Sequence, residues 1–438
     1  MSDQFVNKHG TSDHGVSNQV RTHPTRLALG ASVGGFLFGY DTSTMNAAVP
    51  GIRTVLALGA GSVGFLAAIG LIGCAIGAWM AGPAAARYGR TRIMVIAGAV
   101  IAVGSLAFAA SSRLIVMGAF RLATGMGIGA ASAVVPGYIA EISPTEIRGR
   151  LGTFWQFAIV VGQLAGLVVG YVMTRWAGSE GASLPWGGAA WRWMFVAAAV
   201  LAIVYVPIAR LLPPPPVQYR VERRPLSELR GPRLGLQGVV WIGLLLAAFQ
   251  QLVGISVVKT YSNTIWQAVG AATTSAFTIS MVTVVISILS TVVAIAIMDR
   301  VGRRTLLTIG AAAMTVALAG LALCFSTVTD TGDTLSLGRG AMIGALVSMN
   351  LFAIAFGITW GPVMWLMVNE LFDSRLRITA VAVCTAGNWL TNWLVVRTFP
   401  LLAEAGLGLA YGFFALFAGL AFLFAFRVLP ETRGTALR

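Results

Sequence analysis

The chain contains twelve apolar segments, each long enough to cross the hydrocarbon core of a membrane. That core is roughly 30 Å thick and takes a helix of about 20 mostly apolar residues. The segments lie near residues 26–48, 61–81, 92–110, 114–139, 151–174, 191–212, 235–263, 275–297, 305–326, 340–368, 378–396 and 407–428. Because backbone polar groups in lipid need partners within a helix or a closed barrel, this pattern predicts an all-α integral membrane protein with twelve transmembrane helices.

Composition and charge agree with a membrane protein. Of the 438 residues, 57% are hydrophobic and 10% are charged. The net charge of +15 comes from Arg and Lys residues that are dispersed over many loops, which argues against a nucleic-acid-binding face. Most of these residues fall in loops on the side of both termini. The positive-inside rule therefore predicts cytoplasmic termini and a multi-pass protein of the cell membrane.

The apolar pattern divides into two halves of six segments. Pro213–Pro216 and the charged residues after them interrupt it, and the loop Arg87–Arg90 after the second segment resembles Asp299–Arg304 after the eighth. A six-plus-six repeat is typical of transporters whose binding site lies between two related bundles. We predict a cytoplasmic tail over 1–25, bundles over 26–212 and 235–428, a cytoplasmic linker over 213–234 and a cytoplasmic tail over 429–438.

The residues needed for enzyme chemistry are missing from the apolar segments. All three histidines precede the first segment, and the three cysteines are scattered in a way that suits packing. Neither a nucleophile with a base nor a metal-binding cluster is recognisable, and neither lysine completes a phosphate-binding motif for an ATP-driven pump. We expect no enzyme activity, no cofactor and no bound metal.

Asp41 is the only carboxylate well inside an apolar segment, and Arg121 and Lys259 are the two basic residues that lie well inside such segments, away from their ends. Ionisable groups within a membrane usually belong to an ion or substrate pathway. Burial favours a protonated acid and a nearby cation favours an ionised one, so movement of Arg121 relative to Asp41 would drive a proton cycle. The alternative is a static ion pair that fixes the packing of the first and fourth helices.

Amide and tryptophan side chains in the segments suit a sugar ligand. Amides hold both donors and acceptors, and an indole ring offers a flat apolar face. The candidates are Gln156, Gln163, Gln250, Gln251, Trp365, Asn388, Trp389, Asn392 and Trp393. The alternative is that these amides join helices to each other and that the tryptophans mark the membrane interface.

Six motifs, each at the expected end of a segment, resemble the sugar porter family of the major facilitator superfamily. The resemblance covers about residues 28–437 and is strongest to bacterial proton-coupled pentose and hexose symporters of the xylose type. The motifs are Gly34–Asp41, Arg121–Gly125, Tyr138–Glu141 with Glu146–Gly149, Gln250–Gly254, Trp360–Trp365 with Glu370–Phe372, and Pro430–Gly434.

The resemblance implies two six-helix bundles in the major facilitator fold and proton coupling through Asp41 and Arg121, since passive members carry a neutral residue at the Asp41 position. It implies sugar contacts at Gln156, Gln250, Gln251, Gly361, Trp365, Asn388 and Trp389, with Phe38 on an aromatic wall, and Gln163 is a further candidate. Ser256, Thr260 and Ser287 stand where the family pattern has two amides and a tyrosine. We retain these three as candidate substrate contacts.

Lys259 stands where the family pattern has an aromatic residue. Its ammonium group could snorkel to the outer vestibule, face Asp41 across the cavity, or meet an acidic substrate. We favour snorkelling. If Lys259 reaches Asp41, the acid would be held ionised and proton coupling would be lost.

Charged loop residues suggest a cytoplasmic latch that holds the two bundles together in the outward-open state, as the resemblance implies. The candidates are Arg87, Arg90, Glu141, Arg148, Asp299, Arg300, Arg303, Arg304, Glu370 and Arg377. Ala86 replaces the family's aspartate in the first half, so we expect that half of the latch to be weaker. The alternative is that these charges only set the topology. Trp360-Gly361-Pro362 predicts a hinge in the tenth segment.

The leading hypothesis is proton-coupled symport of a monosaccharide or polyol by alternating access, with the lipid bilayer as surroundings and no nucleic acid partner. We expect a monomer to be the functional unit. Three alternatives stay open: a passive sugar uniporter, a transporter of an anionic sugar acid, and a nutrient sensor that binds without transport.

Overall fold

The computed structural model describes residues 24–58, 60–179, 181–215, 229, 231, 236–259, 266, 273–330 and 335–433. The predicted N-terminal tail, most of the predicted linker, and Thr260 lie outside these residues. Helices occupy all twelve predicted segments, and the all-α prediction is confirmed. Among the described residues, regular structure other than helix is limited to a two-residue strand pair, β1 (Thr329–Asp330) and β2 (Leu335–Ser336), between two helices.

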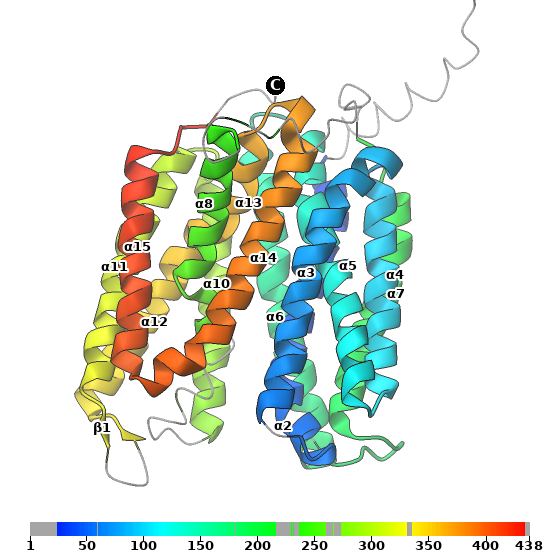
Figure 1. Cartoon of the computed structure of the whole chain (residues 1–438), viewed down its shortest axis with the longest axis vertical. Helices are drawn as coiled ribbons and strands as arrows, with labels where there is room; N and C mark the ends of the chain where they lie inside the picture. The colour runs from blue at the N-terminus through cyan, green and yellow to red at the C-terminus, as the bar shows by residue number, and fades with distance from the viewer. Residues whose placement is uncertain are drawn as a thin grey trace, which may run out of the picture.

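The two halves form two bundles that stand side by side (Figure 1). The first consists of α2 (Pro24–Val55), α3 (Ala60–Tyr88), α4 (Arg90–Ala110), α5 (Leu114–Ile142), α6 (Arg148–Ala177) and α7 (Ala190–Leu211). The second consists of α8 (Gly238–Leu252), α10 (Thr273–Ile297), α11 (Arg303–Ser326), α12 (Arg339–Ile358), α13 (Trp360–Glu370), α14 (Ser374–Glu404) and α15 (Leu407–Arg427).

Nine stretches of helix in the described part of the chain are long and apolar enough to span a membrane, with α12 and α13 counted as one. Their outer faces are apolar: Val103, Ile115 and Leu323 are 66%, 84% and 70% exposed. A helix that is apolar on its exposed face as well as its packed face is typical of lipid surroundings. The molecule is therefore a multi-pass membrane protein.

Two of the longest helices, α2 and α14, are less apolar than these nine. Their polar residues include Asp41 and Asn46 on α2 and Asn388 and Asn392 on α14, and all four line the central cavity described below. The lower hydropathy of these two helices thus reflects polar groups that they supply to the interior.

Close helix packing within the first bundle depends on glycine. A Cβ atom on Gly39 of α2 would overlap the carbonyl of Ile159 on α6, and one on Gly129 of α5 would overlap the carbonyl of Cys74 on α3. Small residues let membrane helices approach closely, where van der Waals packing holds them together. These contacts fix α2, the helix that carries Asp41, against α6.

Two helices are interrupted beside the cavity. The tenth predicted segment breaks at Thr359, where φ is −121° and ψ is −85°, and α13 starts at Trp360. This agrees with the predicted hinge, and Pro362 falls in the first turn of α13, where a missing N–H costs little. The seventh segment breaks at Gly254, with φ of +82°, a conformation that favours glycine. Helix resumes over residues 255–259.

The loops that follow α3, α5, α10 and α13 all lie at the upper end of the molecule in Figure 1. We name this the basic end because Arg90, Arg148, Arg303 and Arg377 lie there. The two bundles touch at this end: a Cβ on Gly82 of α3 would lie 2.6 Å from the Cβ of Ala382 on α14. Toward the opposite end, α3 and α14 diverge (Figure 1).

Candidate functional site

A cavity of about 130 Å³ lies between the two bundles. At roughly 10–15 Å³ for each water molecule, this space suits a small polar solute. Nine of the predicted substrate-binding residues line it: Phe38, Gln156, Gln163, Gln250, Gln251, Ser256, Trp365, Asn388 and Trp389. The charged residues in its lining are Asp41, Arg121 and Lys259.

Asp41 of α2 and Arg121 of α5 form a buried ion pair in the cavity wall. Arg121 Nη1 donates to Asp41 Oδ1 at 2.6 Å, and the Arg121 and Asp41 side chains are 8% and 6% exposed. Arg121 Nε has no hydrogen-bond partner among the described residues. Gly70 of α3 leaves room for the guanidinium group, since a Cβ there would lie 3.1 Å from Nε. The Asp41 contact thus leaves part of the donor capacity of Arg121 unused.

An amide cluster from α8 and α14 forms the facing wall. Asn388 Nδ2 donates to Gln250 Oε1 at 2.9 Å and to the carbonyl of Ala247 at 2.7 Å. Gln251 Nε2 donates to Asn388 Oδ1 at 3.2 Å, and Ser256 Oγ donates to Gln251 Oε1 at 2.9 Å. The break at Gly254 returns Ser256 to the cluster. These bonds join α8 to α14, as in the alternative that the amides join helices to each other.

Gln156 and Gln163 line the cavity from α6, seven residues apart and hence two turns apart on one helix face. Gly361 is not part of the cavity lining. Its carbonyl accepts a hydrogen bond from Gln250 Nε2 at 3.4 Å, and a Cβ on it would lie 3.3 Å from Cδ of Gln156. Gly361 therefore lies behind the two glutamines and leaves them room.

Aromatic contacts join the bundles across the cavity. Phe38 of α2 meets Trp389 of α14 edge to face, with ring centroids 5.0 Å apart, and Trp155 of α6 meets Trp365 of α13 at 6.1 Å. Trp389 Nε1 also donates to Ser132 Oγ of α5 at 2.9 Å. Ser132 was missed by the sequence analysis, because one serine in an apolar segment carries no distinguishing signal.

The other two departures from the family pattern differ in placement. Ser287 of α10 is absent from the cavity lining, and its hydroxyl donates to the carbonyl of Thr283 at 2.9 Å. Lys259 lies in the cavity lining and follows the C-terminal end of α8, which starts near the basic end and runs away from it (Figure 1). No carboxylate among the described residues forms an ion pair with it, and Asp41 is engaged by Arg121.

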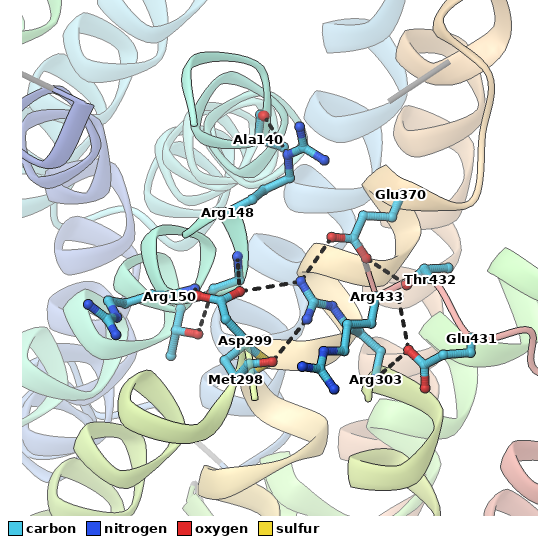
Figure 2. A network of polar contacts seen from close by, with 12 residues as sticks. Ala140, Arg148, Arg150, Met298, Asp299, Arg303, Glu370, Glu431, Thr432 and Arg433 are labelled. Carbon is cyan, nitrogen blue, oxygen red and sulfur yellow. Dashed lines mark hydrogen bonds and ion pairs between the residues drawn. The ribbon is translucent and has the colours of Figure 1, made fainter. Parts of the chain in front are cut away.

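A second polar network joins the bundles at the basic end (Figure 2). Asp299, which follows α10, accepts hydrogen bonds from the backbone N–H of Gly149 at 2.8 Å and of Arg150 at 2.9 Å. Both N–H groups belong to the first turn of α6 in the other bundle. A Cβ on Gly149 would overlap Asp299 Oδ1. The carboxylate therefore caps a helix N-terminus across the interface.

The remaining contacts of this network lie within the second bundle. Arg303 Nη2 lies 3.3 Å from Glu370 Oε1 and 3.6 Å from Asp299 Oδ1. Glu431 accepts from the backbone N–H of Arg303 at 2.8 Å, and Thr432 Oγ1 donates to Glu370 Oε2 at 2.6 Å. Glu431 and Thr432 belong to a motif that stands out in the sequence, but none of their contacts was predicted.

The remaining candidate latch residues come from both bundles, and Arg148 of α6 interacts electrostatically with Glu370 of α13 across the interface. Arg90 donates to Glu141 through Nε at 2.8 Å and Nη2 at 2.6 Å, with both side chains 4% exposed. Other arginines of this set contact backbone carbonyls or a ring: Arg148 Nε donates to Ala140, Arg377 to Phe372 and Arg304 to Phe426, and Arg87 lies over the ring of Tyr88. Arg300 is exposed.

Comparison with known proteins gives a consistent result over both halves. A family model described as "Sugar (and other) transporter" matches residues 27–228 and 227–438. The glucose transport protein of Synechocystis is 36% identical over 443 residues, which cover 93% of this chain and 94% of the relative.

Two solved structures of a xylose transporter differ in their likeness to this chain. The proton:xylose symporter XylE bound to 6-bromo-6-deoxy-D-glucose has a TM-score of 0.83 at 30% identity, over 95% of this chain and 98% of that chain. The inward-open conformation of XylE from E. coli has a TM-score of 0.71 at 29% identity, over 95% and 98%.

Proposed function

Because the chain belongs to the sugar transporter family of the major facilitator superfamily, we propose that it is a symporter that moves a monosaccharide or polyol together with a proton. The family consists of transporters, and the chain is not an enzyme. The observation that carries proton coupling is the buried Asp41–Arg121 pair in the wall of the cavity. A passive carrier has no need of a costly buried charge beside its substrate.

In the proposed cycle, protonation of Asp41 removes the charge that holds Arg121. The guanidinium, with a donor still unused among the described residues, then turns toward another acceptor in the cavity. The neutral acid is cheaper to keep in a low-dielectric interior than an unpaired carboxylate. Loss of the proton from Asp41 on the other side of the membrane restores the Asp41–Arg121 pair. The empty carrier then returns to its starting state.

Substrate and proton act on the same helix. Phe38 and Asp41 are three residues apart on α2, so they lie about one turn apart, and both line the cavity. A sugar ring that stacks on Phe38 or Trp389 thus lies next to the acid. Its binding changes the water and the hydrogen bonds around Asp41, which links occupancy of the site to protonation.

The amide cluster supplies the sugar hydroxyl contacts in this proposal. The bond from Gln251 to Asn388 at 3.2 Å and that from Gln251 to Gln250 at 3.4 Å are longer than the usual length of about 2.9–3.0 Å. Replacing these two bonds with bonds to sugar hydroxyls therefore costs little binding free energy. Gln156 and Gln163 present further amides from the opposite bundle, so a bound sugar contacts both halves.

We further propose that the basic end faces the cytoplasm, as the positive-inside rule favours, and that the structure represents a state closed on that side. The cross-bundle cap of Asp299 on α6 supports this. So does the lower TM-score with the inward-open xylose transporter. Transport then requires the Asp299 contact to break and the basic end to open.

The test is uptake by the purified full chain in liposomes with an imposed inward proton gradient. A panel of labelled neutral sugars, polyols and sugar acids identifies the best substrate. Wild type should accumulate it above the outside concentration. Asp41→Asn should lose accumulation and keep counterflow exchange, while Glu404→Gln, an equivalent change at an exposed position, should behave as wild type.

The alternatives predict different results in the same assay. A passive uniporter equilibrates substrate without accumulating it, and a sensor binds substrate without exchange. Accumulation by Asp41→Asn equal to that of wild type would rule out Asp41 as the coupling residue.

A further inference from the structure

Lys259 contributes a positive charge to the cavity that no described residue balances. The described part of the lining contains three charged side chains, and two of them, Asp41 and Arg121, neutralise each other at 2.6 Å. The empty cavity therefore has a net charge of +1 from its described residues. A charge in a low-dielectric site with no partner is costly, so the Lys259 ammonium needs either water that solvates it or an anionic ligand that supplies the counter-charge.

The position of Lys259 directs it toward the substrate site. Helix resumes after Gly254, and the N–H of Val258 donates to the Gly254 carbonyl at 3.1 Å. On this turn Ser256 and Lys259 are three residues apart and share one face, while Val257 and Val258 are buried in protein. Ser256 contacts Gln251 at 2.9 Å. The lysine thus continues the polar face that begins with the amide cluster.

The sequence analysis favoured a Lys259 that snorkels to the outer vestibule, and its place in the cavity lining does not contradict that expectation. A lysine that runs along the lipid-facing or rim surface would lie outside the cavity. Lys259 instead borders the cavity together with Ser256 and Ile255. It lies on the side away from the closed basic end, where a substrate would enter in this state.

We propose that the preferred substrate is a monosaccharide derivative with one carboxylate, of the uronate or aldonate class, and that Lys259 binds this carboxylate. The hydroxyl groups occupy the amide cluster and the ring stacks against Trp389 and Phe38. This proposal rests on the proposed proton symport and specifies its substrate class. A charge-assisted bond from an ammonium to a carboxylate is among the stronger hydrogen bonds in proteins, so it discriminates well against the neutral sugar.

Charge balance over the transport cycle agrees with a monoanion. With Asp41 ionised, the empty cavity has a net charge of +1. Protonation of Asp41 together with binding of a neutral sugar raises the net charge to +2, whereas protonation together with binding of a monoanion keeps the net charge at +1. The loaded carrier then moves no more charge through the low-dielectric interior than the empty one does. Uptake of the acid with one proton is electroneutral, so membrane potential should not drive it.

The experiment compares acids with their neutral counterparts in the reconstituted full chain. The probes are D-glucuronate with D-glucose, D-galacturonate with D-galactose, and D-gluconate with D-glucitol, each as a competitor of labelled uptake and as a labelled substrate. In wild type, at least one acid should bind roughly tenfold or more tightly than its counterpart. Its uptake should follow the pH gradient and be insensitive to a potential set with potassium and valinomycin.

Two variants distinguish a substrate contact from a structural role. Lys259→Met keeps most of the length of the side chain and removes the charge, so it should lose the preference for the acid by the same factor while neutral sugar uptake persists. Lys259→Arg should retain the preference. The melting temperature of each purified variant reports whether it has folded.

The results separate the two levels of the proposal. Tighter binding of the neutral member in every pair, or an unchanged acid preference in Lys259→Met, would overturn the role of Lys259 and leave proton symport intact. Proton-independent uptake of every probe would overturn the symport on which it rests.

Discussion

The Asp299 cap on α6 should set the balance between the closed and open states of the basic end. Its two oxygens accept from the N–H groups of Gly149 and Arg150, which belong to the other bundle. Asp299→Asn keeps the size of the side chain but leaves one acceptor oxygen and no charge. Its NH2 group would face a backbone N–H group or the Arg303 guanidinium, which lies 3.6 Å from the native carboxylate. Both of these are donors, so the NH2 group cannot bond with either.

The magnitude follows from the contacts that are lost. A hydrogen bond to a charged group contributes roughly 1.5–3 kcal/mol against about 1 for a neutral one, and a charge at a helix N-terminus contributes about 0.3–1 kcal/mol. Since one of the two bonds survives as a bond to a neutral acceptor, we expect the closed state to lose about 1–2 kcal/mol of free energy of stabilisation relative to the open state. That corresponds to a shift of roughly 5–30-fold toward the open basic end.

The assay is a distance measurement by double electron–electron resonance in liposomes or nanodiscs. Spin labels at the exposed positions Arg92 and Arg427 report on one bundle each at the basic end, with the three native cysteines replaced. Glu431→Gln is the matched control, because Glu431 also caps a helix through the N–H groups of Arg303 and Arg304, but within the second bundle.

Asp299→Asn should enlarge the long-distance population, and Glu431→Gln should leave it close to that of the parent. Equal distributions in the parent and Asp299→Asn, or an equal shift in both variants, would refute the view that the cross-bundle cap is the latch.

Two further predictions concern stability and affinity. Arg90→Gln leaves the buried Glu141 carboxylate without its two hydrogen bonds, so the protein should lose about 3–5 kcal/mol of stability. Its melting temperature in detergent should fall, and it should recover in part when Glu141→Gln is added. An unchanged melting temperature would contradict this. Asn388→Ala removes the residue that bonds both Gln250 and Gln251, so substrate affinity should fall roughly tenfold in competition binding, and unchanged affinity would show that the cluster does not bind substrate.

The helices were predictable because exposed polar backbone groups are energetically costly along the whole length of a membrane-spanning segment. Segment 92–110 corresponds to α4 (Arg90–Ala110), and segment 407–428 to α15 (Leu407–Arg427). The break near Trp360 was also predictable, since a glycine and a proline adjoin it. The break at Gly254 was not, because the chain contains 52 glycines and its positive φ has no sequence signature of its own.

The candidate site was predictable where a residue type is rare in an apolar segment. Asp41, Arg121 and the glutamines stand out for this reason, and the structure brings them to one cavity. Contacts that depend on backbone or on distant small residues were not predictable. The acceptor Asp299 meets N–H groups that every residue has, and Ser132 meets Trp389 from 257 residues away.

Proton movement with substrate distinguishes coupled from passive transport most directly. Liposomes that contain the wild-type chain and a pH-sensitive dye, with no imposed gradient, receive the best substrate from outside. We predict that the lumen acidifies as substrate enters, and that liposomes with Asp41→Asn exchange substrate without this change. Substrate entry through the wild-type protein with no acidification would contradict proton symport and the role of the Asp41–Arg121 pair.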